Sequence, residues 1–253
     1  MRYLANTHRA LILAAGRGSR LGRLTADRPK ALVHVGKKSL IERVLSSLSE
    51  AGIEDIRIVT GYQSHLLASY SNNTFNNPNW ATTGIFYSAS TADAWLCQGD
   101  TIISYSDIFY GPNLVRHLCA AAHNIAIGYD PNAAALWRQR SSEPLSDLES
   151  FRFDRGLMRL VEIGARNPDW EDVQGQYMGL IKVTAEGWRQ LESTAKRLPS
   201  STYQEVDFTT LLSLTIAHGV PVHVVENKEP WGEVDHASDI ALYERQYFGV
   251  HGG

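Results

Sequence analysis

A glycine-rich segment with several cationic side chains lies between two apolar stretches near the start of the sequence. An apolar run over 10–15 leads into Gly16, Gly18 follows, and the basic residues Arg20 and Lys30 come next. Glycines let backbone N–H groups approach a ligand closely, and arginine and lysine supply positive charge for phosphates. The spacing predicts a strand and a loop that binds a nucleoside triphosphate. The glycines alone would equally suit a tight turn, and the basic residues alone a solvated loop.

Two common phosphate-binding signatures do not fit this loop. No Gly-Lys-Ser or Gly-Lys-Thr follows it, as the P-loop requires. Leu21 stands where the dinucleotide-binding motif has its third glycine, and no acidic residue ends the second strand in the expected place. The loop therefore predicts a nucleotide site of another kind.

An aspartate at the expected end of a strand is the second candidate for chemistry. Ile102 and Ile103 predict a buried strand, and Asp107 falls at or just past its carboxyl end. Open α/β sheets bind ligands at that end of their strands. An aspartate in this place also commonly forms a turn or caps a helix, so the residue alone leaves both alternatives open.

The elements expected around these residues alternate between strand and helix. A capping box at Ser39 begins a helical pattern that ends near Gly52, and a strand is expected over 53–60. Later apolar segments continue the alternation. The pattern predicts an α/β fold, with a Rossmann-like, mixed, mostly parallel sheet flanked by helices, in a single domain over residues 1–253.

Composition and charge narrow the classes of protein. A net charge of −3 and a pI near 6.3 argue against a nucleic-acid partner. The apolar run over 10–15 is far shorter than the ~20 residues of a membrane span, and the first nine residues contain no apolar signal core. Cys97 and Cys119 have no metal-ligand spacing and fit a reducing compartment. We expect a cytoplasmic protein without a membrane partner, and leave a homo-oligomer open.

Together these motifs resemble the signature of the sugar-phosphate and phosphocholine nucleotidylyltransferases. In that family a strand, a Gly-x-Gly-Ser/Thr-Arg loop and a downstream Pro-Lys pair form the nucleotide site. The matching residues are Leu13, Ala14, Ala15, Gly16, Gly18, Ser19, Arg20, Pro29 and Lys30. The resemblance implies that Lys30 contacts the α-phosphate and Arg20 the β- and γ-phosphates during catalysis. It also implies that the backbone of 14–16 meets the base and the ribose.

The same resemblance implies a site for a divalent metal ion. The family places one metal-binding aspartate after a strand, where Asp107 matches, and a second before the terminal helix, where Asp235 matches. Glu233, two residues before the second aspartate, is the alternative candidate for this metal-binding position. The implied cofactor is Mg²⁺, which prefers oxygen ligands.

Two further segments are assigned by this resemblance, one to the base and one to the acceptor. The aromatic and hydroxyl-rich segment 80–88 stands where the family recognises the base, and the residues assigned to this role are Thr83, Gly84 and Ser88. The acceptor pocket is expected to be lined by a small β-hairpin insertion and by strands over about 130–185. The residues assigned there are Glu162, Gln176, Gly179 and Lys182. A solvated edge hairpin is the alternative for the insertion.

The segments near Asp107, Gly175 and Asp235 are most similar to those of the cytidylyltransferases. They imply transfer of CMP from CTP to a small phosphocholine-like or phosphonate acceptor, with release of pyrophosphate. One alternative is a sugar-1-phosphate enzyme that makes an NDP-sugar. Another is a catalytically silent, nucleotide-binding regulatory protein, since fold does not imply function. A choline group would favour an aromatic cage, for which the candidates are Trp80, Phe86, Tyr87, Trp137, Tyr177 and Trp231. A phosphonate with a carboxylate would instead favour basic side chains, for which the candidates are Arg138, Arg140 and Lys182.

Overall fold

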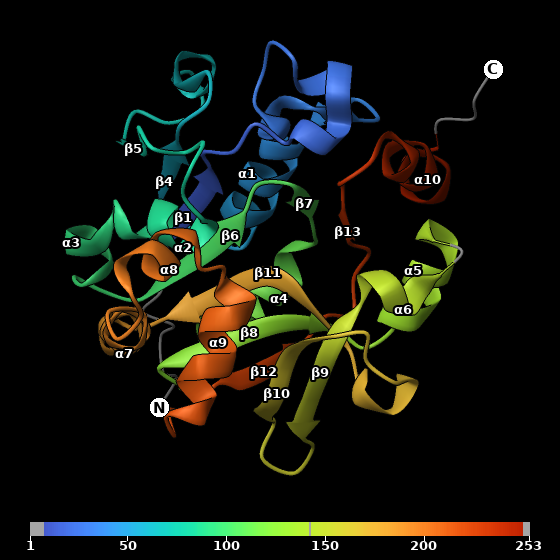
Figure 1. Ribbon diagram of the computed structural model, residues 1–253. Coiled ribbons are helices and arrows are strands. Elements are labelled where there is room, and N and C mark those ends of the chain that lie inside the picture. Colours follow the sequence, from blue (N-terminus) through green and yellow to red (C-terminus); the bar gives the residue numbers. More distant parts are fainter. Residues whose placement is uncertain (1–7, 142, 250–253) are drawn as a thin grey trace.

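A nine-stranded sheet forms the centre of the fold, which the computed structural model describes over residues 8–141 and 143–249 (Figure 1). Its strands are β1 (Arg9–Ala14), β4 (Asp55–Thr60), β5 (Thr74–Asn76), β6 (Thr101–Tyr105), β8 (Ile125–Asp130), β9 (Glu149–Asp154), β10 (Arg159–Arg166), β11 (Gln176–Val183) and β12 (His223–Glu226). They follow the order β5-β4-β1-β6-β11-β8-β12-β10-β9, and all point in one direction except β11 and β10. This confirms the predicted mixed, mostly parallel α/β sheet. The expected domain limits, 1 and 253, lie outside the described residues.

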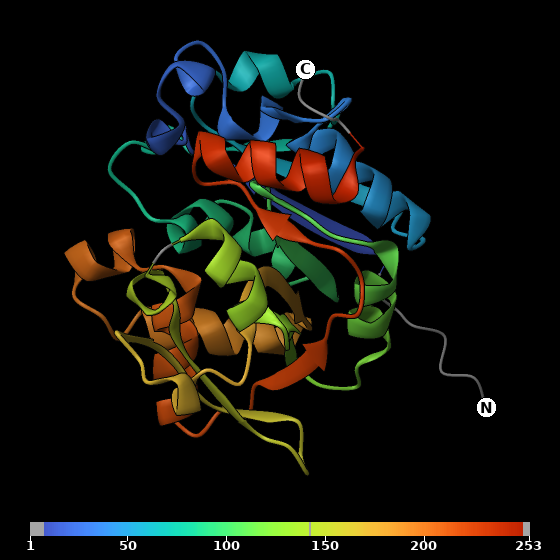
Figure 2. The same ribbon diagram turned by 90° about the vertical axis from the view of Figure 1, so that its right-hand side faces the viewer.

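Helices cover both faces of this sheet, as Figures 1 and 2 show from two sides. They are α1 (Leu40–Glu50), α2 (Ile85–Ser90), α3 (Asp93–Leu96), α4 (Pro112–Ala120), α5 (Ala133–Arg140), α6 (Pro144–Asp147), α7 (Ala185–Ala195), α8 (Ser200–Glu205), α9 (Phe208–Ala217) and α10 (Ala237–Tyr247). Side chains of β1 alternate between two apolar cores. Ala10, Ile12 and Ala14 pack with α1, α4, α5 and α10. Leu11 and Leu13 pack with α2, α3, α7 and α9.

Among the described residues, no helix combines the length and the apolar composition needed to cross a lipid bilayer. The capping box predicted at Ser39 is present at the start of α1. The Ser39 hydroxyl accepts from the Glu42 amide, and the Glu42 carboxylate accepts from the Ser39 amide at 2.7 Å. Both groups would otherwise be unpaired at a helix N-terminus, so this local sequence fixes where α1 begins.

The register of β1 and β6 places the two candidate segments next to each other. Leu13 pairs with Tyr105 in a parallel ladder, so the glycine-rich loop after β1 and Asp107 after β6 leave the sheet at the same edge. Near the end of the chain, β13 (Gly232–Glu233) pairs antiparallel with β7 (Ile108–Phe109). The Val234 amide then donates to the Asp107 carbonyl at 2.9 Å. This pairing brings Asp235 to the edge where ligands bind in such sheets.

In the region over about 130–185, where a hairpin insertion and strands are predicted, the structure differs at the start of the insertion. The hairpin is present as β9 and β10, but the residues before it form the helices α5 and α6. Three consecutive alanines at 133–135 favour a helix there, although the residues that follow are polar. The strand β11 lies in the middle of the sheet, between β6 and β8, and is buried on both faces from Tyr177 to Val183. A strand covered on both faces belongs to the central sheet.

Candidate active site

A cleft of about 520 Å³ opens at the carboxyl ends of β1 and β6. It is lined by Leu13, Ala15, Gly16, Gly18, Ser19, Arg20, Lys30, Trp80, Thr83, Gly84, Ile85, Ser88, Ser106, Asp107, Glu233 and Asp235. The structure therefore brings together the glycine-rich loop, the segment assigned to the base and both aspartates. Ala14 is the exception within the loop motif, because its side chain is buried in the core below the cleft.

Gly18 gives the loop a conformation that other residues rarely adopt. Its φ of 75° and ψ of 52° are left-handed, and the Thr25 hydroxyl donates to its carbonyl at 2.9 Å. A Cβ at this position would lie 2.6 Å from the Cβ of Lys30. Glycine is needed here for both reasons, since the backbone must turn sharply and the lysine must pass close to it.

Lys30 lies between the two aspartates. Its Nζ donates to Asp107 Oδ2 and to Asp235 Oδ1, each at 2.8 Å, across separations of 77 and 205 residues. Burial by itself would lower the pKa of Lys30, but the two carboxylates raise it above its ordinary value. Burial would likewise raise the pKa of Asp235, but Lys30 and Arg140 lower it. The amine and this carboxylate are therefore both charged at neutral pH.

A third carboxylate, that of Glu233, completes an acidic group in the cleft. Oxygen atoms of Asp107, Glu233 and Asp235 all lie within 4.8 Å of one another. Burial, together with the charges of the two aspartates, raises the pKa of Glu233. Oδ1 of Asp107 is buried and has no hydrogen-bond partner among the described residues. Such a group of oxygens has the chemistry that a hard divalent cation prefers.

Arg20 stands at the mouth of the cleft with a largely exposed side chain. It is 71% exposed, and its Nη1 lies 3.7 Å from Asp235 Oδ1. A long, solvated arginine retains the freedom to reorient towards an anion, and its planar group binds phosphates through paired hydrogen bonds. This position agrees with a role at the outer phosphates.

A buried asparagine that no sequence motif marks organises the segment assigned to the base. Asn77 donates from Nδ2 to the Thr83 hydroxyl at 2.9 Å and to the Ser88 hydroxyl at 3.0 Å. Gly84 packs so closely that a Cβ there would lie 2.4 Å from the carbonyl oxygen of Glu205. Asn77 lies in an asparagine-rich loop, and in the sequence nothing separates it from its exposed neighbours.

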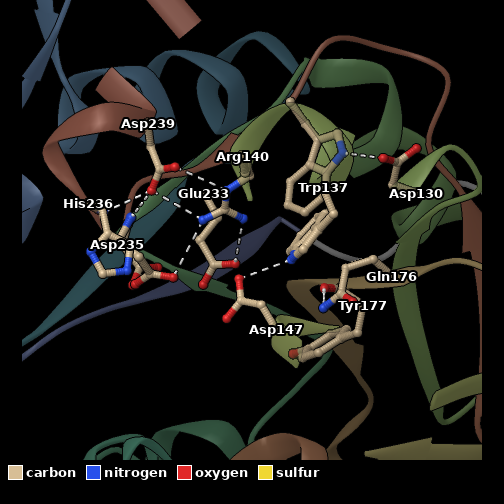
Figure 3. Close-up of polar contacts among 12 residues, drawn as sticks. Asp130, Trp137, Arg140, Asp147, Gln176, Tyr177, Glu233, Asp235, His236 and Asp239 are labelled. Carbon is tan, nitrogen blue, oxygen red and sulfur yellow. Dashed lines mark hydrogen bonds and ion pairs between the residues drawn. The ribbon is translucent and has the colours of Figure 1, made fainter. Parts of the chain in front are cut away.

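Arg140 is a second residue whose position only the structure reveals. It comes from α5, and its Nε and Nη2 donate to the two carboxylate oxygens of Asp239 at 3.2 Å each (Figure 3). Oδ2 of Asp239 in turn accepts from the backbone amides of Asp235 and His236, at 2.8 Å each. Arg140 is thereby linked to the acidic group through the N-terminus of α10.

Lys182, assigned to the acceptor, needs correction. Its side chain is 3% exposed and donates to the carbonyls of Ala121 and His123, at 3.2 and 2.9 Å. It pairs in β11 with Ile102, near the start of β6, whereas the cleft lies at the opposite end of that strand. The antiparallel direction of β11 carries this lysine away from the site.

The other three acceptor residues also stand outside the cleft lining. Glu162 forms an ion pair with Arg152 at 2.8 Å on the β9–β10 hairpin, which contributes no lining residue. Gly179 has a φ of 75° and packs against the ring of Tyr105. The Gln176 side chain donates to the backbone carbonyl of Tyr177 at 3.2 Å. Packing and ion pairs within the sheet account for these three residues.

The aromatic residues considered for a cage are largely part of the core. Trp137 is 2% exposed, Trp231 is 4% exposed and Phe86 is completely buried. The indole N–H of Trp137 donates to Asp147 at 3.1 Å (Figure 3). That of Trp231 donates to Asp130 at 2.8 Å. These side chains are therefore committed to packing, and Trp80 is the candidate that lines the cleft.

At the sheet edge near Lys182, the rings of His123 and His223 stack with centroids 3.3 Å apart. Desolvation lowers the pKa of both, aided at His123 by Lys182 and at His223 by His123. The folded protein binds fewer protons here than the unfolded chain, so this stability is present above the unfolded pKa of about 6.5 and is lost as the pH falls through the lower, folded values. Urea unfolding between about pH 7.5 and 5.5 is expected to show a steeper loss for the wild type than for His123→Gln/His223→Gln. Equal slopes would contradict this account.

Comparison with known proteins agrees with the geometry of the cleft. Residues 10–170 match the model of the MobA-like NTP transferase domain. The chain is 30% identical over 249 residues to a CTP:phosphoglutamine cytidylyltransferase of Campylobacter jejuni, and the alignment covers 92% of this chain and 98% of that protein. It is 28% identical over 146 residues to a CMP-5'-(3-aminopropyl)phosphonate synthase of Streptomyces rubellomurinus, covering 54% of this chain and 22% of that protein.

A solved structure shows the same fold. The CTP:phosphocholine cytidylyltransferase of Streptococcus pneumoniae aligns with a TM-score of 0.73 and 21% identity, over 95% of this chain and 99% of that one. The family match covers more than half of the chain and includes the whole glycine-rich loop and Asp107. The chain therefore belongs to the MobA-like NTP transferase family and is a nucleotidyltransferase.

Proposed function

We propose that the protein transfers CMP from CTP to a small acceptor bearing a phosphate or phosphonate group, with Mg²⁺ as cofactor and pyrophosphate as the second product. The relative that aligns along nearly its whole length is named for CTP and phosphoglutamine. The two further relatives are named for an aminopropylphosphonate and for phosphocholine. All three acceptors are small, contain nitrogen and carry a phosphorus oxyanion. These names support an acceptor of this class, and a sugar phosphate is the alternative acceptor.

One observation carries the proposal. In a single cleft, Lys30 and Arg20 converge on a glycine-rich loop beside Asp107 and Asp235. Nucleotidyl transfer brings two anions together, so its catalysis consists mainly of charge neutralisation and alignment. A cationic loop opposite a group of carboxylates supplies what such a reaction needs.

The proposed step is an in-line displacement at the α-phosphorus of CTP. An oxygen of the acceptor forms the new bond to phosphorus, and the bond from phosphorus to the oxygen bridging to the β-phosphate breaks. That oxygen leaves with its electron pair as part of pyrophosphate. Lys30 stabilises the charge that builds on the α-phosphate, and Arg20 holds the phosphates that leave. The acceptor oxyanion is already ionised at neutral pH, so the step needs no general base, and no histidine lines the cleft among the described residues.

The donor set fits the proposed cofactor. Asp107 and Asp235 would hold Mg²⁺, with Glu233 beside them, and the unpartnered Oδ1 of Asp107 provides a free ligand atom. All three side chains offer carboxylate oxygens, which suit a hard cation. When bound, Mg²⁺ neutralises phosphate charge and orients the triphosphate.

Pyrophosphate release is the direct test. Each of the four common ribonucleoside triphosphates and dTTP would be combined with phosphoglutamine, phosphocholine, aminoalkyl phosphonates and glucose 1-phosphate, with and without Mg²⁺. The proposal expects Mg²⁺-dependent release with CTP and a nitrogen-containing acceptor. Release only with a sugar 1-phosphate would favour an NDP-sugar enzyme. Nucleotide binding without release for any pair would favour a silent regulatory protein.

Gly18→Ala is expected to lower both stability and activity. An alanine in the left-handed region costs about 1 to 2 kcal/mol, and its Cβ would displace Lys30. Thermal unfolding and pyrophosphate release check the two effects. Gly16→Ala is the matched control for stability, because its Cβ would meet no atom within 4 Å. Equal melting temperatures for the two variants would contradict the packing argument.

A further inference from the structure

We infer that Arg140 is a positioning residue for the cation site, acting through Asp239 on the backbone that carries Asp235. This rests on the proposed function, because it assigns Arg140 a role towards the carboxylates that would bind Mg²⁺. Arg140 is not among the residues that line the cleft proposed for the nucleotide. Its effect is on where the Asp235 carboxylate lies.

The contacts form an unbroken chain from α5 to the cleft. Two nitrogens of Arg140 bind the two oxygens of Asp239, and one of those oxygens accepts from the amides of Asp235 and His236. Nη2 of Arg140 also lies 3.7 Å from Asp235 Oδ2, and Nη1 lies 3.9 Å from Glu233 Oε2. Arg140 therefore contacts both acidic residues contributed by the segment before α10.

The guanidinium is held in a fixed place by its surroundings. Its side chain is 4% exposed and that of Asp239 is 3% exposed. The guanidinium carbon lies 4.6 Å from the ring centre of Trp137, whose indole N–H is bound by Asp147 (Figure 3). A paired, planar contact of this kind fixes orientation as well as charge, which a lysine at the same place does not do.

Burial of this ion pair is not explained by stability alone. Buried pairs are often replaced by apolar residues at no cost to folding, so their presence is weak evidence for a purely structural role. Nη1 of Arg140 is buried, has no hydrogen-bond partner among the described residues and lies 3.9 Å from Glu233 Oε2. When a residue that orients a metal ligand through hydrogen bonds is replaced, metal affinity or activity commonly falls by about 10- to 100-fold.

Arg140→Lys, which keeps the charge and removes the bidentate contact with Asp239, tests the inference. We expect the affinity for Mn²⁺ in the presence of CTP, measured by electron paramagnetic resonance, to weaken about 10-fold or more. We expect kcat to fall by a similar factor. CTP binding without metal, measured by calorimetry, should be unchanged. The matched control is Arg138→Lys on the same helix, where the arginine is exposed and stacks 4.5 Å from the ring of Trp170. This control should resemble the wild type in all three measurements.

A double-variant cycle tests whether Arg140 acts through Asp239. Since the two residues would work as one unit, Arg140→Lys/Asp239→Asn should lose no more Mn²⁺ affinity than the more damaging single variant. Additive losses would overturn the route through Asp239. A melting temperature lowered by Arg140→Lys, with Mn²⁺ affinity and kcat equal to the wild type well below that temperature, would overturn the positioning role. A wild type that binds no Mn²⁺ would overturn the proposed cation site and this inference together.

Discussion

Replacing Lys30 with alanine is expected to lower the rate of pyrophosphate release at saturating substrates by about 100-fold or more, the scale of losing one positioned donor to transition-state charge. The reason is the position of the amine. It reaches the cleft beside Gly18, and among the described residues no other basic side chain donates to both Asp107 and Asp235. The exposed Lys37, in the turn between β2 (His34–Val35) and β3 (Lys38–Ser39), is the matched control. Lys37→Ala should keep the wild-type rate.

The same variant should have a second, opposite effect on cation binding. In the structure the Lys30 ammonium lies 2.8 Å from an oxygen of each aspartate, so it competes with a divalent cation for those oxygens. Without nucleotide, Lys30→Ala should therefore bind Mn²⁺ more tightly than the wild type, while its turnover is lower. A near-normal rate would remove Lys30 from the catalytic assignment. Unchanged Mn²⁺ affinity would show that the amine does not occupy the cation position.

Asp107→Asn is expected to abolish most Mg²⁺-dependent activity. A bound cation supplies several kcal/mol of charge stabilisation, so its loss corresponds to roughly 1,000-fold in rate. Asn keeps the size of the side chain but removes a negative charge from the acidic group. The measurement is the rate of pyrophosphate release as a function of Mg²⁺ concentration. The expected result is a low rate that no longer rises with Mg²⁺.

The control for this variant is a carboxylate that also pairs with a basic side chain but lies far from the cleft. Asp55 pairs with Arg57 at the start of β4, at the opposite end of the strands from the cleft, and Asp55→Asn should behave like the wild type. Asp235→Asn should reproduce the loss seen with Asp107→Asn, because both side chains bind Lys30 and face the same space. A normal Mg²⁺ response in either cleft variant would disprove its assignment as a ligand.

Some assignments are local in origin and the sequence predicts them well. The glycine-rich loop depends on neighbouring residues, since an apolar strand must end before Gly16 and only glycine suits the backbone at Gly18. The capping box at Ser39 is equally local. Asp107 was placed correctly at a strand end, because the apolar run before it marks a buried strand. Its partner Asp235 followed only from the resemblance to a family.

The errors concern residues whose role depends on distant contacts. Lys182 and Arg140 are both basic residues in the region expected to meet the acceptor. The direction of β11 places Lys182 at the end of the strands opposite the cleft, where it binds the His123 carbonyl, whereas α5 places Arg140 against Asp239. The residues of α5 fall partly in the segment predicted as a hairpin insertion, because the last residues of this helix are polar and charged. The segment of β11 is predicted as a strand, but its place in the middle of the sheet depends on distant contacts.

By itself the sequence determined the α/β class, the loop after the first strand and the identity of its cationic residues, because periodicity, glycine spacing and charge act over a few neighbouring positions. Only the tertiary structure decided that the Lys30 amine lies between two carboxylates 77 and 205 residues away, and that Arg140 supports one of them from behind. The physical reason is that strand register and helix packing, rather than local propensity, fix which distant side chains share one edge of the sheet.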